Sequence, residues 1–313
     1  MNSPDPPRSL SIRVPASTSN LGPGFDCLGL ALDLFLDVRL TGPKREAEHD
    51  RTLAGPSTAS WPSASEDLTI RAFERACEAL GVAATHWSWQ IESEIPIGRG
   101  LGSSGAAVAA GIRLAGALAP EPPTLARELA LGIELEGHPD NVAASLIGGA
   151  TLCVPIEGQQ PACTPLELSP ELGFALAWPL EPLTTSAARE ALPSSVLFSD
   201  ALENPRRLGL LLAGLRNADA RLLTLGGEDR LHERYRLPLI PGAEAALAAG
   251  RAAGAWLASL SGSGSALFAI CPKPTAERVA EAMRAELERA RPGAVARTAH
   301  AVREGARVRE VTG

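Results

Sequence analysis

The segment 86–118 constrains the fold of this chain more than any other. It begins with HWSWQIES, in which Trp87, Trp89 and Ile91 alternate with polar residues as they do in a half-buried strand. The residues PIGRGLGSSG follow directly, and a run of small apolar residues then predicts a close-packed helix over 103–118. A strand, a glycine-rich loop and a helix therefore succeed one another without a linker.

The loop at 96–105 has the composition of an anion-binding site. Its glycines at positions 98, 100 and 102 permit positive φ angles and close approach of the backbone to a ligand. The start of the following helix offers unpaired amides and a positive dipole end, which together suit a triphosphate. Ser103 and Ser104 can cap this helix, and one hydroxyl can also reach a Mg²⁺ on the phosphates. Because the stretch is neither G-x-x-x-x-G-K-[ST] nor G-x-G-x-x-G, the glycines alone leave an ordinary tight turn equally open.

Composition narrows the class of protein. Of 313 residues 45% are hydrophobic and 21% are charged, as in a globular protein with a substantial core. The net charge of -7 argues against a basic surface for nucleic acid or acidic membranes. We see no secretory signal, and no apolar stretch approaches the roughly 18 residues of a membrane span. The five cysteines are scattered and the histidines have no metal-ligand spacing, which predicts a cytoplasmic protein without structural zinc.

Helical and strand patterns alternate in both halves of the chain, which favours an α+β or α/β fold. The Pro-rich passage 155–170 is the expected boundary between two domains, residues 1–165 and 166–313. The residues before Ser9 and the segment 42–65 are expected to be exposed or poorly ordered. Strands are predicted at 9–14, 34–40, 86–93, 150–154, 173–178, 255–259, 265–271 and 294–302, and helices at 103–118, 123–136, 140–146, 242–253 and 275–290, with helical patterns dominating 185–230.

Two further loops carry glycine with polar residues. VPASTSNLGPGFD at 14–26 follows the first strand, and SGSGS at 261–265 lies between two predicted strands. In the first loop Asn20 offers a donor and an acceptor, and Asp26 could receive an ammonium group. The purely structural alternatives are, for 14–26, a turn with Asp26 as a helix cap and, for 261–265, a simple hairpin turn.

Together the three loops resemble the signature motifs of the GHMP kinases, in order and at sensible spacing. P-x-x-x-G-L-G-S-S-[AG] at 96–105 is similar to the phosphate loop of that family, and the residues at 14–26 and 261–270 are similar to its first and third motifs. The motif EGHPDNVA at 136–143 resembles the corresponding motif of the homoserine kinases within the family. Thr185-x-x-x-Arg189 and Arg236-x-x-Leu-Ile-Pro match them as well. The resemblance covers essentially the chain from Ser9 to Val302.

The resemblance implies an α+β two-domain fold, with an N-terminal domain like ribosomal protein S5, an α/β C-terminal domain and the active site in the interdomain cleft. The implied reaction converts ATP and L-homoserine to ADP and O-phospho-L-homoserine, a step toward threonine. It implies no nucleic-acid or membrane partner and leaves a homodimer open. The alternatives are a mevalonate-type alcohol kinase and a nucleotide-binding regulator that has lost catalysis.

The resemblance also assigns roles to individual residues. ATP would be bound by Pro96, Ile97, Gly98, Arg99, Gly100, Leu101, Gly102, Ser103, Ser104 and Gly105. The substrate would be bound by Asn20, Asp26, Asn141, Thr185, Arg189, Arg236 and Gly262, with the arginines on its carboxylate because a guanidinium makes two parallel bonds. Ser104 and one glutamate would hold Mg²⁺, and Glu134 is preferred to Glu136. These two glutamates, two residues apart, cannot share a helix face.

Three residues near the reacting groups remain for catalysis. Ser104 acts through the metal and the phosphates, and Asn141 is expected to orient the substrate hydroxyl. Asp140 is a candidate general base, which a dissociative transition state does not require, and its alternative role is a helix cap. His138 is expected to be a hydrogen-bonded structural histidine. Arg99 either contacts ATP or faces solvent.

Overall fold

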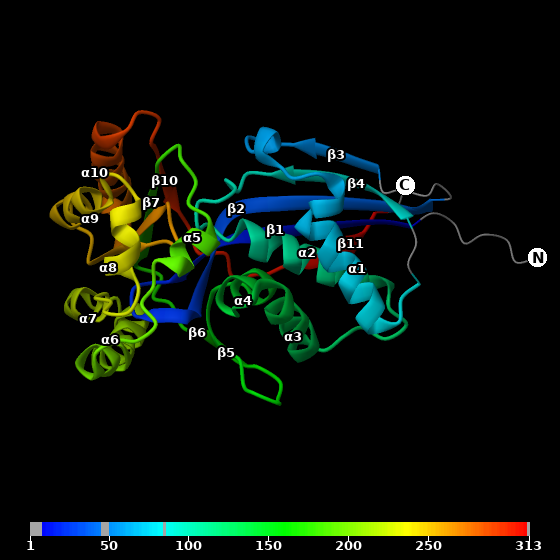
Figure 1. Ribbon diagram of the computed structural model, residues 1–313, viewed down its shortest axis with the longest axis horizontal. Coiled ribbons are helices and arrows are strands. Elements are labelled where there is room, and N and C mark those ends of the chain that lie inside the picture. The colour runs from blue at the N-terminus through cyan, green and yellow to red at the C-terminus, as the bar shows by residue number, and fades with distance from the viewer. Residues whose placement is uncertain (1–7, 45–49, 84–85, 312–313) are drawn as a thin grey trace, which may run out of the picture.

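The computed structural model, which describes residues 8–44, 50–83 and 86–311, has two β-sheets along its long axis, each packed against helices (Figure 1). The first sheet has seven strands: β1 (Arg8–Asn20), β2 (Gly24–Lys44), β3 (Asp50–Ala54), β4 (His86–Ser93), β5 (Ala150–Val154), β6 (Ala162–Leu166) and β11 (Arg307–Glu310). The second has four: β7 (Leu172–Trp178), β8 (Leu257–Leu260), β9 (Leu267–Pro272) and β10 (Val295–Ala299). The expected α+β class is confirmed.

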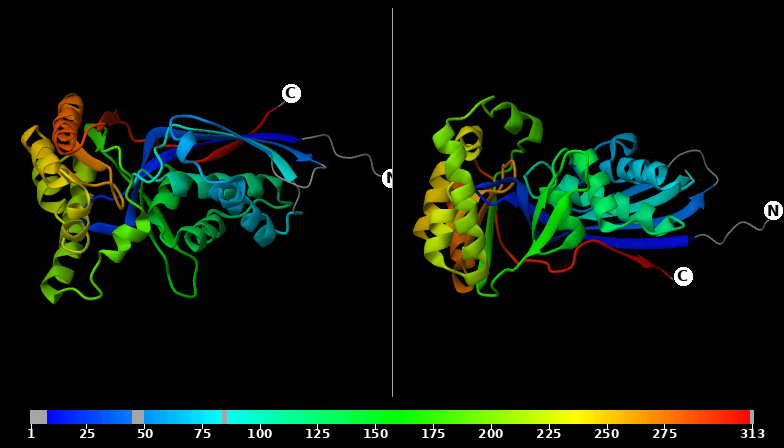
Figure 2. Two further views of the ribbon diagram at one scale, coloured as in Figure 1. Left: turned by 45° about the horizontal axis from the view of Figure 1, so that its top comes forward. Right: turned by 90° about the horizontal axis from the view of Figure 1, so that it is seen from below.

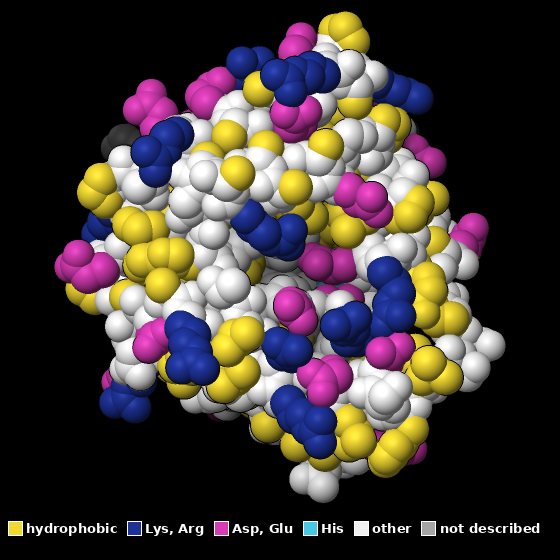
Figure 3. Space-filling view, turned by 90° about the vertical axis from the view of Figure 1, so that its left-hand side faces the viewer, with side chains coloured by type: hydrophobic (Ala, Val, Ile, Leu, Met, Phe, Trp, Pro, Cys, Tyr) yellow, Lys and Arg dark blue, Asp and Glu magenta, His cyan; other side chains and the backbone are white. Residues whose placement is uncertain are grey.

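The helices divide between the two sheets. Those against the first sheet are α1 (Leu68–Leu80), α2 (Ser103–Leu118), α3 (Leu125–Glu136) and α4 (Asp140–Ile147). Those at the other end of the molecule are α5 (Thr185–Glu190), α6 (Phe198–Asn217), α7 (Ala220–Gly226), α8 (Glu233–Arg236), α9 (Ala243–Ala252) and α10 (Ala276–Ala290). Single 3₁₀ turns occupy Thr58–Ser60, Ala64–Glu66, Leu237–Leu239 and Lys273–Thr275. The surface of this second end intersperses basic, acidic and apolar side chains (Figure 3).

The long strand β2 organises the first sheet, whose order is β11-β1-β2-β4-β3. One edge of β2 pairs with β1 over most of its length, and the other pairs first with β5 and then with β4. All pairs are antiparallel except β3 with β4. The last strand β11 returns from the far end of the molecule to pair with β1, as Figure 2 shows.

The core follows the alternation of apolar residues along the strands. In β2 the buried side chains include Leu34, Leu36, Val38 and Leu40, which recur at every second position. Helix α2 is buried along most of its length because its alanines and glycines allow the sheet and α1 to approach closely. A second apolar cluster joins the four-stranded sheet to α9 and α10. Both sheets therefore hold the loops between them on rigid supports.

Several expected elements are confirmed at or near their predicted limits, including the strands 86–93 and 150–154 and the helix 103–118. The loop expected at 14–26 is wrong in extent: residues 14–20 continue β1, and only 21–23 form the turn before β2. Small polar residues suggested a loop there, but Ser17, Thr18 and Ser19 are buried and bind partners elsewhere in the chain.

The segment 42–65 is mostly exposed where it is described, as expected, although it contains the end of β2 and the strand β3. Its residues 45–49, like the start of the chain before Arg8, lie outside the described residues. Sequence reasoning made no prediction for α1, although Asp67 caps its first turn and Gly81 ends it in the left-handed conformation. The domain boundary at 165/166 stays a prediction; the strand β11, which follows it in sequence, lies in the first sheet.

Candidate active site

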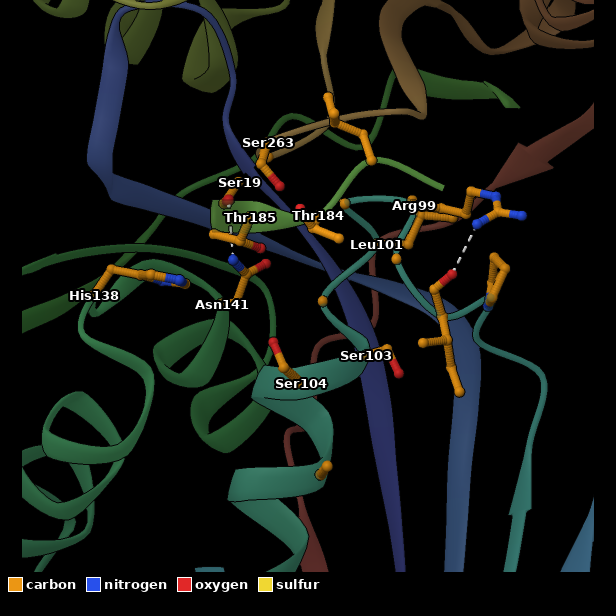
Figure 4. Close-up of a pocket in the computed structure, with 18 of the residues that line it drawn as sticks. Ser19, Arg99, Leu101, Ser103, Ser104, His138, Asn141, Thr184, Thr185 and Ser263 are labelled. Carbon is orange, nitrogen blue, oxygen red and sulfur yellow. Dashed lines mark hydrogen bonds between the residues drawn. The ribbon is translucent and has the colours of Figure 1, made fainter. Parts of the chain in front are cut away.

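A cavity of about 250 Å³ lies where the two parts of the molecule meet. The first part contributes residues from β1, β2, the start of α2 and the start of α4, and the second contributes the segment 183–189, α8 and the loop after β8 (Figure 4). Of the residues predicted for the site, all line this cavity except Gly105 and Glu134. Segments that are far apart in sequence are therefore brought together.

The loop 96–105 lies over the start of α2. Gly98, Gly100 and Gly102 have φ angles of 69°, 70° and 69°, which place all three in the left-handed region. A Cβ on Gly100 would lie 2.1 Å from the carbonyl oxygen of Ser261, and a Cβ on Gly102 would lie 2.0 Å from Ser17 Oγ. Gly100 and Gly102 are therefore required for two reasons: their left-handed φ angles and the lack of space for a side chain.

The expected serine cap of α2 is wrong. Gly102 is the N-cap residue and makes no side-chain cap hydrogen bond, while Ser103 and Ser104 are the first two helical residues. The left-handed Gly102 starts the helix one residue earlier than a serine cap would. The first amides of α2 therefore have no capping side chain and remain suited to an anion at the cavity.

Contact of Arg99 with ATP stays a prediction. Arg99 lines the cavity, but its guanidinium donates to the carbonyl oxygens of Ile97, Pro179 and Leu180. The first carbonyl lies in its own loop, and the other two lie just beyond β7. Arg99 thus ties the loop to the segment that leads into α5.

The two candidate glutamates lie in different environments. Ser104 Oγ donates to Glu136 Oε2 at 3.0 Å, and only 4% of the Glu136 side chain is exposed. Neither glutamate lines the cavity, and the Glu134 side chain is 52% exposed and forms an ion pair with Arg75 at 2.8 Å. The metal ligand stays a prediction, and Glu136 rather than Glu134 is the glutamate that contacts Ser104.

Burial raises the pKa of Glu136, although His138 and the Ser104 hydroxyl oppose the shift. Burial alone would lower the pKa of His138, but the hydrogen bond and charge of Asp140, together with the charge of Glu136, raise it overall. His138 Nδ1 lies 2.8 Å from Asp140 Oδ1, so His138 is a hydrogen-bonded histidine as expected.

Asp140 and Asn141 form the end of α4 that faces the cavity. Asp140 is not the N-cap, which is Pro139; its Oδ1 accepts from the Asn141 backbone amide at 2.7 Å. The Asn141 amide nitrogen donates to Ser19 Oγ and to Asp140 Oδ1, and its Oδ1 accepts from Ser17 Oγ at 2.9 Å. One acceptor lone pair of Asn141 Oδ1 thus remains for a ligand.

The substrate residues predicted from β1, β2 and α5 contact one another. Arg189 donates through both terminal nitrogens to the two oxygens of Asp26, at 3.1 and 2.9 Å. Asn20 Nδ2 donates to the Gly262 carbonyl, and Asn20 Oδ1 accepts from the Asp26 amide. A carboxylate and a guanidinium, the partners expected for an ammonium and a carboxylate group, therefore form a bidentate pair at the cavity wall.

Arg236 is buried, and burial lowers its pKa. Its Nε donates to the Ala188 carbonyl at 3.2 Å, and its Nη1 lies 3.5 Å from the Gly262 carbonyl and 3.4 Å from His232 Nδ1. The guanidinium carbon lies 5.0 Å from the centre of the Phe25 ring, on which the His232 ring also stacks. Phe25 and His232 are site-supporting residues that sequence reasoning did not find.

A group of cavity residues from the segment 61–68 was also missed. Trp61 Nε1 donates to Asp67 Oδ2 at 2.7 Å, and Arg51 forms a 2.6 Å ion pair with the same oxygen. Trp61, Pro62 and Leu68 give one end of the cavity an apolar wall. A lone tryptophan between prolines and serines was the available signal. Further cavity residues that were not predicted are Ser19, Ala107, Leu183, Thr184 and Ser263.

The donor set at the start of α2 suits Mg²⁺. Ser104 and Glu136 supply one hydroxyl and one carboxylate, and this hard cation takes its remaining ligands from phosphate and water. Within the described ranges, no three His, Cys, Asp or Glu side chains group closely enough to hold a metal by themselves. Among the described helices, none is both long and apolar enough to cross a membrane.

Comparison with known proteins agrees with this geometry. Residues 67–149 match the GHMP kinases N terminal domain, and residues 209–289 match the GHMP kinases C terminal domain. The chain is 39% identical to homoserine kinase of Synechococcus sp. (strain RCC307) over 284 residues, which are 90% of each protein, and 38% identical to that of Prochlorococcus marinus (strain MIT 9303) over 90% of each. The crystal structure of homoserine kinase from Cytophaga hutchinsonii superposes with a TM-score of 0.85 at 27% identity, covering 98% of this chain and 99% of that one.

The chain therefore belongs to the GHMP kinase family. Within that family, the similar proteins named above are homoserine kinases. L. major mevalonate kinase superposes with a TM-score of 0.71 at 14% identity, over 97% of this chain and 99% of that one, and this likeness shows the fold alone.

Proposed function

We propose that this chain is a homoserine kinase, which transfers the γ-phosphoryl group of ATP to the hydroxyl of L-homoserine. The observation that carries the proposal is the cavity in which the loop 96–105 faces Asp26, Arg189 and Arg236. One side offers backbone amides for phosphates, and the other offers both charge signs for an amino acid zwitterion. The identity of 39% to a curated homoserine kinase supports the same substrate.

ATP would lie with its phosphates over the loop 96–105 and the first turn of α2. The left-handed glycines turn the loop backbone around that space, and the dipole of α2 favours negative charge there. The nucleobase would lie toward the apolar wall formed by Trp61, Pro62 and Leu68. Ser104 and Glu136 would hold Mg²⁺, which when bound neutralises charge on the phosphates.

The substrate would bind at the opposite wall, at the cleft between the two domains. Its carboxylate would meet the guanidinium groups of Arg236 and Arg189, and its ammonium group would meet Asp26 beside Asn20. Thr185 and Gly262 border the same space. In the part of the chain that the structure describes, Arg236 Nη2 has no protein acceptor, so it is the donor we assign to the carboxylate.

In the transfer step, the homoserine oxygen forms a bond to the γ-phosphorus while the bond to the bridging oxygen of ADP breaks. Asn141 Oδ1, with its remaining lone pair, would accept a hydrogen bond from the hydroxyl group of homoserine and orient the attacking oxygen. Asp140, held by His138, is the carboxylate nearest in sequence to that amide, and either it or solvent takes the proton. Positioning and charge neutralisation therefore account for most of the catalysis.

The test is an ADP-release assay on purified protein with ATP, Mg²⁺ and a panel of alcohols that includes L-homoserine and mevalonate. We expect turnover with homoserine, and mass spectrometry should find the phosphate on the amino acid. Turnover with mevalonate alone would contradict the substrate. Binding of ATP without phosphoryl transfer to any alcohol would instead favour a regulator.

A further inference from the structure

The buried imidazole of His232 contacts two separate parts of the site. His232 is fully buried, and its Nε2 lies 2.9 Å from the carbonyl oxygen of Gly22 in the turn between β1 and β2. Its Nδ1 lies 3.4 Å from Arg236 Nη1. Its ring stacks on Phe25 with centroids 4.8 Å apart and an interplanar angle of 20°.

The two partners decide the protonation of the ring. A carbonyl oxygen only accepts, so Nε2 must carry a hydrogen, and a guanidinium nitrogen only donates, so Nδ1 must carry a lone pair. His232 is therefore neutral, with its proton on Nε2. Burial, the largest cause, lowers the pKa of His232, which agrees with a neutral ring.

The residues around His232 hold it rigidly. Asp229 accepts from the backbone amides of Leu231, His232 and Glu233, with distances from 2.7 to 3.1 Å. Asn204 donates to the same carboxylate at 2.8 Å. The buried Glu233 accepts from the Leu260 amide at 2.7 Å, next to the loop 261–265. The start of α8 is thus fixed to both glycine loops of the substrate wall.

We propose that His232 is a positioning residue for substrate binding: it holds the Arg236 guanidinium in a fixed place relative to the turn that precedes Asp26. The proposal rests on the proposed function, in which Arg236 and Asp26 bind the two ends of an amino acid. His232 would not contact the substrate. Its effect would pass through the Arg236 Nη1 contact and the Phe25 ring that both side chains share.

Two substitutions separate the two contacts. His232→Gln retains an amide near the Gly22 carbonyl but removes the acceptor from Arg236, whereas His232→Asn places an amide oxygen close to the former Nδ1. We expect His232→Gln to raise the KM for homoserine about tenfold, as loss of one hydrogen bond to a charged group does, with the KM for ATP unchanged. His232→Asn should recover part of that loss. An unchanged KM for homoserine in His232→Gln overturns the proposal.

A second measurement does not depend on a variant that folds. Ring ¹⁵N chemical shifts of the wild-type protein report the tautomer of His232 directly. We expect a neutral ring with the proton on Nε2 throughout neutral pH, and a proton on Nδ1 contradicts the contact to Arg236. If wild-type protein shows this tautomer but does not turn over homoserine, the proposed function fails while the contact stands.

A second and independent observation concerns two cysteines remote from the mechanism. Cys153 on β5 and Cys163 on β6 are directly opposite in an antiparallel pair, so their side chains point to the same face. Pro165, opposite Thr151, has no amide hydrogen, which favours a non-hydrogen-bonded position there. Hydrogen-bonded and non-hydrogen-bonded pairs alternate along an antiparallel ladder, so pairs two residues apart are of the same kind. Cys153 and Cys163 are therefore expected to form a non-hydrogen-bonded pair, with a Cα separation of about 4.5 Å.

That separation lies within the range that a disulfide spans. Both thiols are free, and the neighbouring Cys153 thiol lowers the pKa of Cys163. Cys163 is partly exposed on β6, which among the described strands pairs only with β5, whereas Cys153 is buried. Cys163 is therefore the accessible nucleophile, and Cys153 is the thiol behind it.

We propose that Cys153 and Cys163 are a site of reversible thiol oxidation by small disulfides such as oxidised glutathione. The Cys163 thiolate attacks one sulfur of that disulfide, forms a mixed disulfide and releases one glutathione thiolate. The Cys153 thiol then gives up its proton and attacks the Cys163 sulfur, which releases the second glutathione. Two protein thiols are oxidised as one disulfide is reduced, and β5 becomes linked to β6.

The test treats the native full-length protein with oxidised glutathione, blocks the remaining thiols and digests it with a glutamate-specific protease. Glu157 is exposed and lies between the two cysteines, so cleavage after it leaves the two fragments joined only by a disulfide. We expect loss of two of the five thiols, and the joined fragments should separate on reduction. Cys27→Ser should behave like wild type and Cys163→Ala should give no joined fragments. Separate fragments from oxidised wild type, or a Cys27–Cys153 link, overturn the proposal.

Discussion

The two walls of the cavity recognise charge by different means. At the phosphate wall, the loop 96–105 presents backbone amides and glycines in left-handed conformations. At the substrate wall, Asp26, Arg189 and Arg236 present charged side chains held by tertiary hydrogen bonds. The first wall depends on the shape of one continuous segment. The second depends on four separate segments that meet: β2, α5, α8 and the loop after β8. Substitutions at the two walls should therefore fail in different ways.

The largest effect is expected for Gly100→Ala at the phosphate wall. The new Cβ would combine left-handed strain with a 2.1 Å contact to the Ser261 backbone, so unfolding should become easier by about 3 kcal/mol and turnover should fall more than about 100-fold. Gly81→Ala is the matched control, because Gly81 has φ 67° but no atom of the described residues lies within 4 Å of the added Cβ. Denaturant unfolding should show that this control lowers the free energy of unfolding by about 1 kcal/mol. Equal losses in the two variants would mean that space at Gly100 is irrelevant.

Ser104→Ala should lower kcat about 100-fold and leave the KM for homoserine nearly unchanged, since the hydroxyl faces Glu136 and the proposed metal. Ser103→Ala, one residue earlier on α2, should lower kcat by less than about tenfold, because only the backbone amide of Ser103 is assigned to the phosphates. Steady-state kinetics with both substrates varied give the comparison. A Ser104→Ala enzyme with wild-type turnover would remove this side chain from the transfer step.

At the substrate wall, Arg236→Ala should raise the KM for homoserine about 30-fold and change the KM for ATP little, because a charge-assisted bond to the carboxylate is lost. Arg234→Ala is the control on the same helix, since Arg234 pairs with Asp200 at the surface and does not line the cavity. An effect of Arg236→Ala confined to the KM for ATP would place this arginine at the other wall.

The smallest expected effect, on stability, separates the two glutamates of α3. Because burial raises the folded-state pKa of Glu136 above its unfolded value, its contribution to stability is fully present below the unfolded pKa and is lost as pH rises through the folded pKa. Glu136→Gln should therefore stabilise the metal-free protein by about 1 kcal/mol at neutral pH, and less in acid. Glu134→Gln, which removes only an exposed ion pair, should change stability by less than about 1 kcal/mol. Thermal unfolding across pH measures both variants, and a Glu136→Gln protein less stable than wild type at neutral pH would contradict the sign.

The same contrast explains which parts of the site could be read from the sequence. The phosphate loop was predictable because three glycines, a preceding strand and a following helix are local features. Trp61 was missed because nothing local indicates that its segment folds back onto the cavity, where it meets Asp67. Glu134 and Glu136 could not be ordered for a similar reason: spacing shows that they face different ways, but not which way the helix is turned.

The sequence by itself determined the strand–loop–helix unit at 86–118, the three motifs and the family they resemble, because short-range spacing sets periodicity and backbone freedom. Tertiary structure alone decided that β1 runs on through Ser17–Ser19, that Glu136 rather than Glu134 meets Ser104, and that His232 contacts Gly22. Those outcomes depend on which buried polar groups find partners across the fold. Such pairings join residues tens to hundreds of positions apart, and no local pattern records them.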